Sequence, residues 1–132
     1  MEPKTVLIVD DEMSNTQLFG MMLELEGYRP VVASDAPTAL EALRQHTPDV
    51  MIVDVMLPGA SGLELCRKVR GELGLADLPI VIVSAKSELS DVQAGVAAGA
   101  TVYLTKPVTK AELLGAVSQA VGEGTQRPAA AL

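Results

Sequence analysis

Residues 7–13 read LIVDDEM, so three aliphatic side chains lead directly into three carboxylates. The apolar run that ends there, 5-TVLIV-9, is typical of a strand covered on both faces of a parallel sheet. Comparable runs are 31-VVA-33, 50-VMIV-53, 80-IVIV-83 and 101-TVYL-104. The chain therefore contains five candidate strands, and the first of them ends in a cluster of negative charge.

Helical patterns separate the candidate strands. In the first pattern, apolar residues recur at the i, i+3, i+4, i+7 spacing of an amphipathic helix, which predicts that they face the core: Leu18, Met21, Met22 and Leu25. We interpret Met13 in the same way, as a residue that fills the edge of the core. The second pattern repeats this spacing with smaller side chains: Ala36, Ala39, Leu40 and Leu43.

Three more helices follow. The pairs Ser61–Glu64 and Thr109–Glu112 have the spacing of capping boxes, which predicts that the third and fifth helices begin there. Residues 87–98 predict a fourth helix that contains glycine and many small side chains. Its intrinsic helix propensity is low, so we expect it to be the most easily displaced of the five.

Strands that alternate with helices predict an α/β fold with a parallel sheet. We expect a doubly wound (βα)5 sandwich of the flavodoxin-like type, with strand order 2-1-3-4-5. Pro30 favours this order, because it places the second strand at a sheet edge, where proline is tolerated. The 132 residues fit one domain, which we place at 1–123, with a flexible tail or the start of a linker at 124–132.

Composition excludes several classes of function. The net charge of −7 argues against binding to nucleic acids or anionic membranes, since both require a basic face. The single cysteine excludes an intramolecular disulfide and fits a reducing compartment. No apolar run approaches the roughly 18 residues of a membrane span. We therefore expect a cytoplasmic protein.

Polar residues follow four of the five candidate strands. Asp10 and Asp11 follow the first, Asp54 the third, Ser84 the fourth, and Lys106 lies just beyond the fifth. In open α/β sheets these strand ends form the ligand crevice, at the point where the strand order reverses. Carboxylates gathered there repel one another unless a cation lies between them, and Mg²⁺ prefers such oxygen ligands. The pattern predicts a Mg²⁺ site, for which Mn²⁺ can substitute.

A carboxylate at such a site can act as the nucleophile in phosphoryl transfer and form an aspartyl phosphate. Asp54 is the natural acceptor, because it follows the central strand and has the metal ligands on one side. Lys106 and Ser84 are then placed to bind phosphoryl oxygens from the other side.

Four motifs carry a family resemblance: 8-IVDDE-12, 53-VDVMLPGASG-62, 83-VSAK-86 and 103-YLTKP-107. In this order and at strand ends, they resemble the receiver domain of two-component response regulators, the CheY-like family. The resemblance covers residues 4 to about 122. It implies a signalling phosphoacceptor that catalyses only its own phosphorylation and dephosphorylation.

The resemblance also implies roles for single residues. Asp54 would accept phosphate from a phosphohistidine on a sensor histidine kinase or a phosphotransfer protein. Asp11, Asp54 and the backbone carbonyl of Met56 would hold Mg²⁺, with Asp10 acting through a water. Lys106 would pair with the phosphoryl group.

A switch is implied as well. Ser84 and Tyr103 fill the two positions that change the surface of helix 4, strand 5 and helix 5 after phosphorylation. That surface would meet a downstream effector or output domain, or a second copy in a phosphorylation-dependent homodimer. The family resemblance further implies a cis peptide bond between Lys106 and Pro107.

Three other functions remain open from the sequence. A receiver that is never phosphorylated could serve only as a docking module. A flavodoxin-like electron carrier would need a phosphate loop and stacking aromatics, but aromatics make up only 2% of this chain. A phosphatase with an aspartyl intermediate usually has its nucleophile after strand 1.

Overall fold

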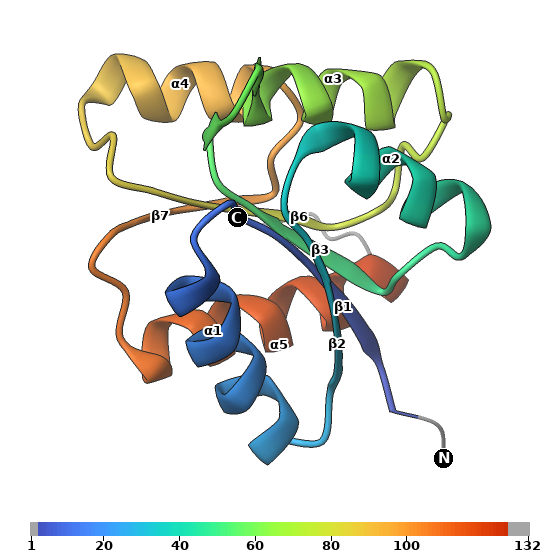
Figure 1. The fold of residues 1–132 in the computed structure, drawn as a ribbon, viewed down its shortest axis with the longest axis vertical. Coiled ribbons are helices and arrows are strands. Elements are labelled where there is room, and N and C mark those ends of the chain that lie inside the picture. The colour runs from blue at the N-terminus through green and yellow to red at the C-terminus, as the bar shows by residue number, and fades with distance from the viewer. Residues whose placement is uncertain (1–2, 127–132) are drawn as a thin grey trace.

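The apolar runs form a parallel sheet in the computed structural model, which describes residues 3–126 (Figure 1). Within those residues five strands build the sheet: β1 (Thr5–Val9), β2 (Arg29–Ala33), β3 (Val50–Val53), β6 (Ile80–Ser84) and β7 (Val102–Thr105). Their order is β2-β1-β3-β6-β7, and all neighbouring pairs are parallel. The predicted order 2-1-3-4-5 and the flavodoxin-like (βα)5 fold are confirmed.

Helices cover both faces of the sheet (Figure 1). α1 (Met13–Leu25) and α5 (Lys110–Gln126) pack on one face, and α2 (Ala36–Gln45), α3 (Gly62–Gly71) and α4 (Leu89–Ala97) lie on the other. Every residue of β1, β3 and β6 is buried, because these strands are covered on both faces. Each face has its own apolar cluster, and the central strands contribute alternate side chains to the two.

The predicted core face of α1 is wrong. The helix buries Thr16, Phe19, Gly20 and Leu23 against the sheet. Leu18, Met21 and Leu25 point away from it and are 49%, 62% and 74% exposed. Met13 is also exposed, and Met22 is only partly buried. Both faces of α1 have apolar residues at helical spacing, so periodicity cannot decide which face packs on the sheet. Phe19 and Leu23 supply the bulk on the packed face, where they join the apolar cluster that α5 and the sheet also form.

The edge strand β2 carries Pro30, as predicted from its sequence position. The Arg29 N–H donates to the Lys4 carbonyl, and the Ala33 carbonyl accepts from the Asp10 N–H, so these two residues face β1. By alternation Pro30 faces outward, where it offers no N–H to another strand. Proline therefore lies at a position where the sheet loses no hydrogen bond.

The helix ends follow local side-chain caps. Thr109 and Glu112 form the predicted reciprocal box, with bonds of 2.9 Å and 3.1 Å between each side chain and the other residue's N–H. Ser61 caps α3 as predicted. Its hydroxyl accepts from the Leu63 N–H at 3.0 Å, whereas the predicted capping box pairs it with the Glu64 N–H. The sequence did not indicate that Glu88 and Asp91 cap α4, which is shorter than predicted.

The last helix is longer than the sequence predicted. α5 continues to Gln126, three residues into the predicted tail at 124–132, and the remainder of that tail lies outside the described residues.

A short antiparallel pair, β4 (Met56–Leu57) and β5 (Ala60–Ser61), connects β3 to α3 and was not predicted. Among residues 3–126, no helix has the length and apolar character needed to cross a bilayer.

Candidate functional site

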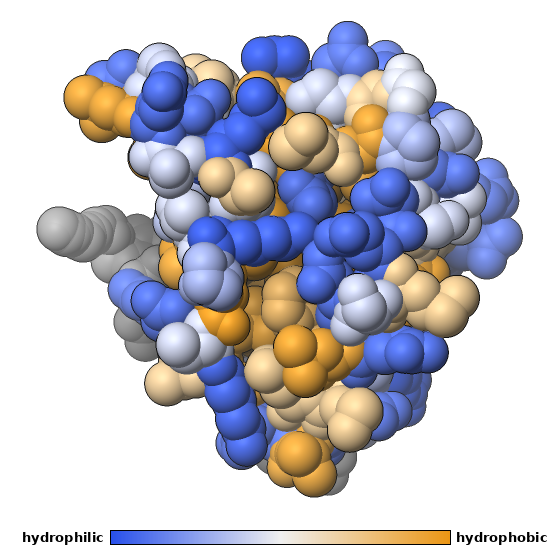
Figure 2. Space-filling view, turned by 60° about the vertical axis from the view of Figure 1, so that its left-hand side comes forward, coloured by the Kyte–Doolittle hydropathy of each residue, from blue (hydrophilic) through white to orange (hydrophobic). Residues whose placement is uncertain are grey.

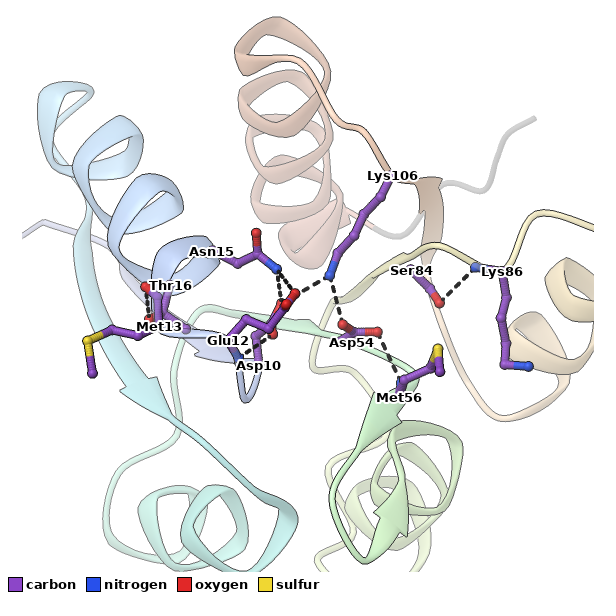
Figure 3. A network of polar contacts seen from close by, with 10 residues as sticks. All are labelled: Asp10, Glu12, Met13, Asn15, Thr16, Asp54, Met56, Ser84, Lys86 and Lys106. Carbon is purple, nitrogen blue, oxygen red and sulfur yellow. Dashed lines mark hydrogen bonds and ion pairs between the residues drawn. The ribbon is translucent and has the colours of Figure 1, made fainter.

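The C-terminal rim of the sheet collects the predicted polar residues (Figure 3). Asp10 follows β1, Asp54 follows β3, Ser84 is the last residue of β6, and Lys106 follows β7. Asp10, Asp54 and Ser84 are buried, with 4%, 7% and 0% of their surface exposed. Buried carboxylates without a partner are costly, so their partners determine what this rim can do.

Lys106 joins the two buried carboxylates. Its Nζ donates to Asp54 Oδ2 at 2.8 Å and to Asp10 Oδ2 at 3.3 Å. Burial alone would lower the pKa of Lys106, but the hydrogen bond and charge of Asp54, with those of Asp10, outweigh it and raise the pKa above its ordinary value. Lys106 is therefore a fixed positive charge at neutral pH, and it approaches Asp54 from the side of β7 and α5 (Figure 3).

Asp10 has further donors, one of which sequence reasoning missed. Its Oδ1 accepts from the Glu12 N–H at 2.9 Å, and its Oδ2 accepts from Asn15 Nδ2 at 3.2 Å. Asn15 also donates to Glu12 Oε1 at 2.9 Å, and Glu12 is the N-cap residue of α1. The only sequence signal for Asn15 is its position three residues after that cap. These bonds hold the β1–α1 connection, and with it Asp10, in a defined place.

Asp54 is positioned by the backbone that follows it. Its Oδ1 accepts from the Met56 N–H at 3.0 Å, while the Met56 side chain is 57% exposed. Gly62, the first residue of α3, packs directly on the Asp54 backbone: a β-carbon there would overlap the Asp54 carbonyl oxygen and lie 2.9 Å from Val55 Cα. Gly62 is the last residue of the motif 53-VDVMLPGASG-62, but no sequence feature indicated this contact.

The Mg²⁺ hypothesis can be tested against these donors. Asp11 is exposed, and residues 3–126 contain no group of three or more His, Cys, Asp or Glu side chains that could hold a metal ion. Mg²⁺ does not require such a group, because it keeps several waters and uses one or two carboxylates. Asp11 directly follows Asp10 in the chain, and the Met56 carbonyl lies two residues beyond Asp54. This set of oxygen donors fits Mg²⁺ better than a softer metal.

Ser84 and Tyr103 lie beside this cluster rather than in it. Ser84 Oγ accepts from the Lys86 N–H at 3.2 Å (Figure 3). The Tyr103 hydroxyl donates to the Lys86 carbonyl at 2.7 Å, and its ring is half-buried. Burial raises the pKa of Tyr103; a hydrogen bond with Ser84 opposes this, and the charges of Asp91 and Asp54 add to it. Both residues therefore connect to the loop that leaves β6.

The peptide bond between Lys106 and Pro107 is cis, as the family resemblance implied. It lies directly after the residue whose Nζ joins the two carboxylates.

A family model for the response regulator receiver domain matches residues 6–118. The chain belongs to the response regulator receiver family. Receivers of this family are signalling domains of two-component systems rather than classical enzymes. The match includes Asp10, Asp11, Asp54, Ser84, Tyr103 and Lys106.

Curated relatives of this receiver include longer proteins. It is 36% identical over 124 residues to the DNA-binding response regulator MtrA of Mycobacterium tuberculosis, covering 94% of this chain and 53% of that protein. It is 37% identical over 127 residues to the phosphate regulon transcriptional regulatory protein PhoB of Pseudomonas aeruginosa, covering 94% of this chain and 56% of that protein. The chain thus spans about half the length of these relatives.

Solved receiver structures share the whole fold. A CheY-like receiver domain protein of Methanospirillum hungatei superposes with a TM-score of 0.88 at 27% identity, covering 96% of this chain and 99% of that one. The chemotaxis response regulator CheY4 of Vibrio cholerae gives a TM-score of 0.84 at 31% identity, covering 89% and 98%.

Proposed function

We propose that Asp54 accepts a phosphoryl group from a phosphohistidine, and that this modification changes the surface formed by α4, β7 and α5. The observation that carries the proposal is Lys106 Nζ at 2.8 Å from Asp54 Oδ2, on a rim where Asp10 and Asp54 are both buried. In the transfer, an Asp54 carboxylate oxygen forms a bond to phosphorus while the P–N bond of the phosphohistidine breaks. The imidazole leaves with that electron pair.

Mg²⁺ would be held by Asp11, Asp54 and the Met56 carbonyl, with Asp10 acting through a water; Mn²⁺ would substitute. When bound, the cation supplies charge neutralisation for the phosphoryl oxygens. Lys106, whose Nζ bonds both Asp54 and Asp10, supplies a second positive charge. The contacts of Asn15 and Glu12 hold the Asp10 carboxylate in place. Positioning and charge are the main contributions a protein makes to this reaction.

The switch uses residues next to the acceptor. A phosphoryl group adds about −1.5 to −2 charges and strong acceptor oxygens, so the Ser84 hydroxyl gains a new partner near Asp54. Ser84 and Tyr103 both contact the Lys86 backbone, which supports a coupled movement of the two side chains. Phosphorylation shifts the equilibrium between the resting and the switched positions of Ser84 and Tyr103. The shift equals the difference in free energy with which the phosphoryl group binds the two. The altered surface would bind an effector, an output domain or a second copy.

The phosphodonor requires its own contact surface, and α1 supplies one. Leu18, Met21 and Leu25 form an exposed apolar stripe, which we call the α1 surface. Figure 2 shows apolar side chains gathered in the lower half of the molecule, below a band of hydrophilic ones. The helix that bears this stripe begins next to Asp10, so a partner that lies along α1 extends towards the rim that carries Asp54. Because its apolar side chains recur at helical spacing, the α1 surface can pack against a helix of a kinase or phosphotransfer protein.

Small-molecule phosphorylation tests the proposed function. With Mg²⁺ and acetyl phosphate, we expect intact-protein mass spectrometry to show the addition of one phosphate. The addition should disappear in Asp54→Asn and when a chelator removes the divalent cation, because both the acceptor and the charge neutralisation are then lost. Equal labelling of Asp54→Asn would refute the assignment.

Met56 is expected to slow hydrolysis of the phosphorylated protein. Its side chain is exposed beside Asp54 and is apolar, so it cannot orient an attacking water. In Met56→Asn we expect the aspartyl-phosphate lifetime to shorten a few-fold, because one hydrogen bond contributes about 1 kcal/mol. Decay of the phosphorylated mass after removal of acetyl phosphate measures the lifetime; an unchanged or longer lifetime would contradict this role.

The α1 surface is expected to matter only for a protein donor. Leu18→Gln combined with Met21→Gln should slow phosphotransfer from a sensor kinase on the order of tenfold when the receiver concentration does not saturate the kinase. This is the effect of losing a modest interface contact. Labelling by acetyl phosphate should stay unchanged. Val96→Gln, which alters an exposed apolar residue on α4, is the matched control. Equal kinase-dependent rates in the wild type and the double variant would exclude this surface as the docking site.

A further inference from the structure

Gly95 is the buried residue of α4, and it faces the ring of Tyr103 on β7. A β-carbon at position 95 would lie 2.7 Å from Cδ2 and 2.9 Å from Cε2 of that ring, and 3.1 Å from Cδ1 of Ile82. When a β-carbon would lie less than 3.0 Å from another heavy atom, one of the two groups has to move. A side chain at position 95 and the Tyr103 ring in its observed place therefore exclude each other.

The position of that ring is linked to the functional site. The Tyr103 hydroxyl donates to the Lys86 carbonyl at 2.7 Å, and the Lys86 N–H donates to Ser84 Oγ. The ring also packs against the apolar cluster on the α2, α3 and α4 side of the sheet. Any change that moves the ring breaks a contact with the loop that follows Ser84.

Helix formation does not account for Gly95. Glycine is a poor residue for a helix interior, and α4 has alanine at two nearby positions, Ala94 and Ala97. Alanine at position 95 would favour the helix itself. The contact with Tyr103 supplies a reason for glycine that the helix does not.

We propose that Gly95 is a positioning residue of the switch: its missing side chain admits the Tyr103 ring beneath α4, and a larger residue holds the ring outside. β7 is an edge strand and Tyr103 is half-buried, so the ring can leave towards solvent without a change of strand pairing. The consequence for signalling rests on the proposed phosphorylation of Asp54, whereas the steric effect does not.

Fluorine NMR can follow the ring directly. The chain has no tryptophan and two tyrosines, so 3-fluorotyrosine gives two signals, and Tyr28→Phe identifies that of Tyr103. In Gly95→Ala we expect the Tyr103 signal to move towards that of an exposed tyrosine and to broaden more with a soluble paramagnetic probe. Gly115→Ala is the matched control, because its added β-carbon meets nothing within 4 Å and should leave the signal in place. Wild-type shift and broadening in Gly95→Ala would overturn the proposal.

A thermodynamic cycle tests the same contact through stability. Gly95→Ala should lower the Tm when Tyr103 is present, because the methyl and the ring compete for one space. In a Tyr103→Ala background it should raise the Tm, because the ring no longer competes, the remaining neighbour Ile82 Cδ1 at 3.1 Å is the end of a flexible side chain that can turn aside, and alanine has the better helix propensity. The same change in Tm in both backgrounds would contradict a steric role for Gly95.

The signalling consequence is measured separately. The fluorine and stability experiments use unphosphorylated protein without Mg²⁺, so a failure of Asp54 to accept phosphate leaves them unaffected. Mg²⁺ and beryllofluoride, a mimic of the phosphoryl group, are then added. We expect smaller amide chemical-shift changes across α4 and β7 in Gly95→Ala than in the wild type. Equal changes would overturn the link between Gly95 and the switch.

Discussion

Gly62→Ala is expected to lower the free energy of unfolding by about 3 kcal/mol, at the upper end of the usual cost of overpacking. The new β-carbon would overlap the Asp54 carbonyl oxygen and crowd Val55 Cα, and both are backbone atoms that no rotamer change can move away. The strain would be relieved by displacing either α3 or the Asp54 backbone. We therefore also expect slower labelling by acetyl phosphate in the fraction that remains folded.

Gly71→Ala is the matched control for this prediction, because Gly71 ends the same helix and a β-carbon there meets nothing within 4 Å. It should be neutral or stabilising by a few tenths of a kcal/mol. Urea unfolding of both variants measures the difference. If Gly62→Ala and Gly71→Ala were equally stable and equally labelled, the tight packing of α3 on Asp54 would not control the acceptor.

Lys106→Ala is expected to slow acetyl phosphate labelling of Asp54 by about tenfold to a hundredfold, because a charge-assisted hydrogen bond contributes about 1.5–3 kcal/mol. The substitution also leaves Asp10 and Asp54 buried without their shared cation. Without Mg²⁺, the free energy of unfolding should fall by about 2 kcal/mol, less than for a fully buried pair, because 20% of the Lys106 side chain is exposed.

Mg²⁺ should restore part of that stability, since Lys106 is not among the proposed metal ligands and metal binding should largely persist. Urea unfolding with and without Mg²⁺ measures this recovery. Lys110→Ala, which removes an exposed lysine four residues away, should change neither stability nor labelling. Wild-type labelling in Lys106→Ala would show that the bridge between the two carboxylates has no part in phosphoryl transfer.

The sequence predicted the sheet well because continuous apolar runs have few other interpretations. β1, β3 and β6 are buried at every position, as their composition indicated. It also placed Asp10, Asp54, Ser84 and Lys106 at one rim, because parallel strands end on the same side of the sheet.

What the sequence could not predict depends on tertiary packing. The orientation of α1 was predicted wrongly because both of its faces have apolar residues at helical spacing, and only the shape of the core selects Phe19 and Leu23. Asn15 could not be assigned to Asp10 from spacing alone, since the contact depends on the path of the β1–α1 connection. The contacts of Gly62 and Gly95 are close approaches between segments, for which composition gives no signal.

The central claim is that phosphate is attached to Asp54, and borohydride trapping tests it most directly. Borohydride reduces an aspartyl phosphate to homoserine but does not convert phosphohistidine or phosphoserine to that product. After treatment with Mg²⁺ and acetyl phosphate, peptide mass spectrometry should find homoserine at position 54 and nowhere else. Homoserine at position 10 or 11, or a stable phosphate on Ser84 with Asp54 unmodified, would contradict the account.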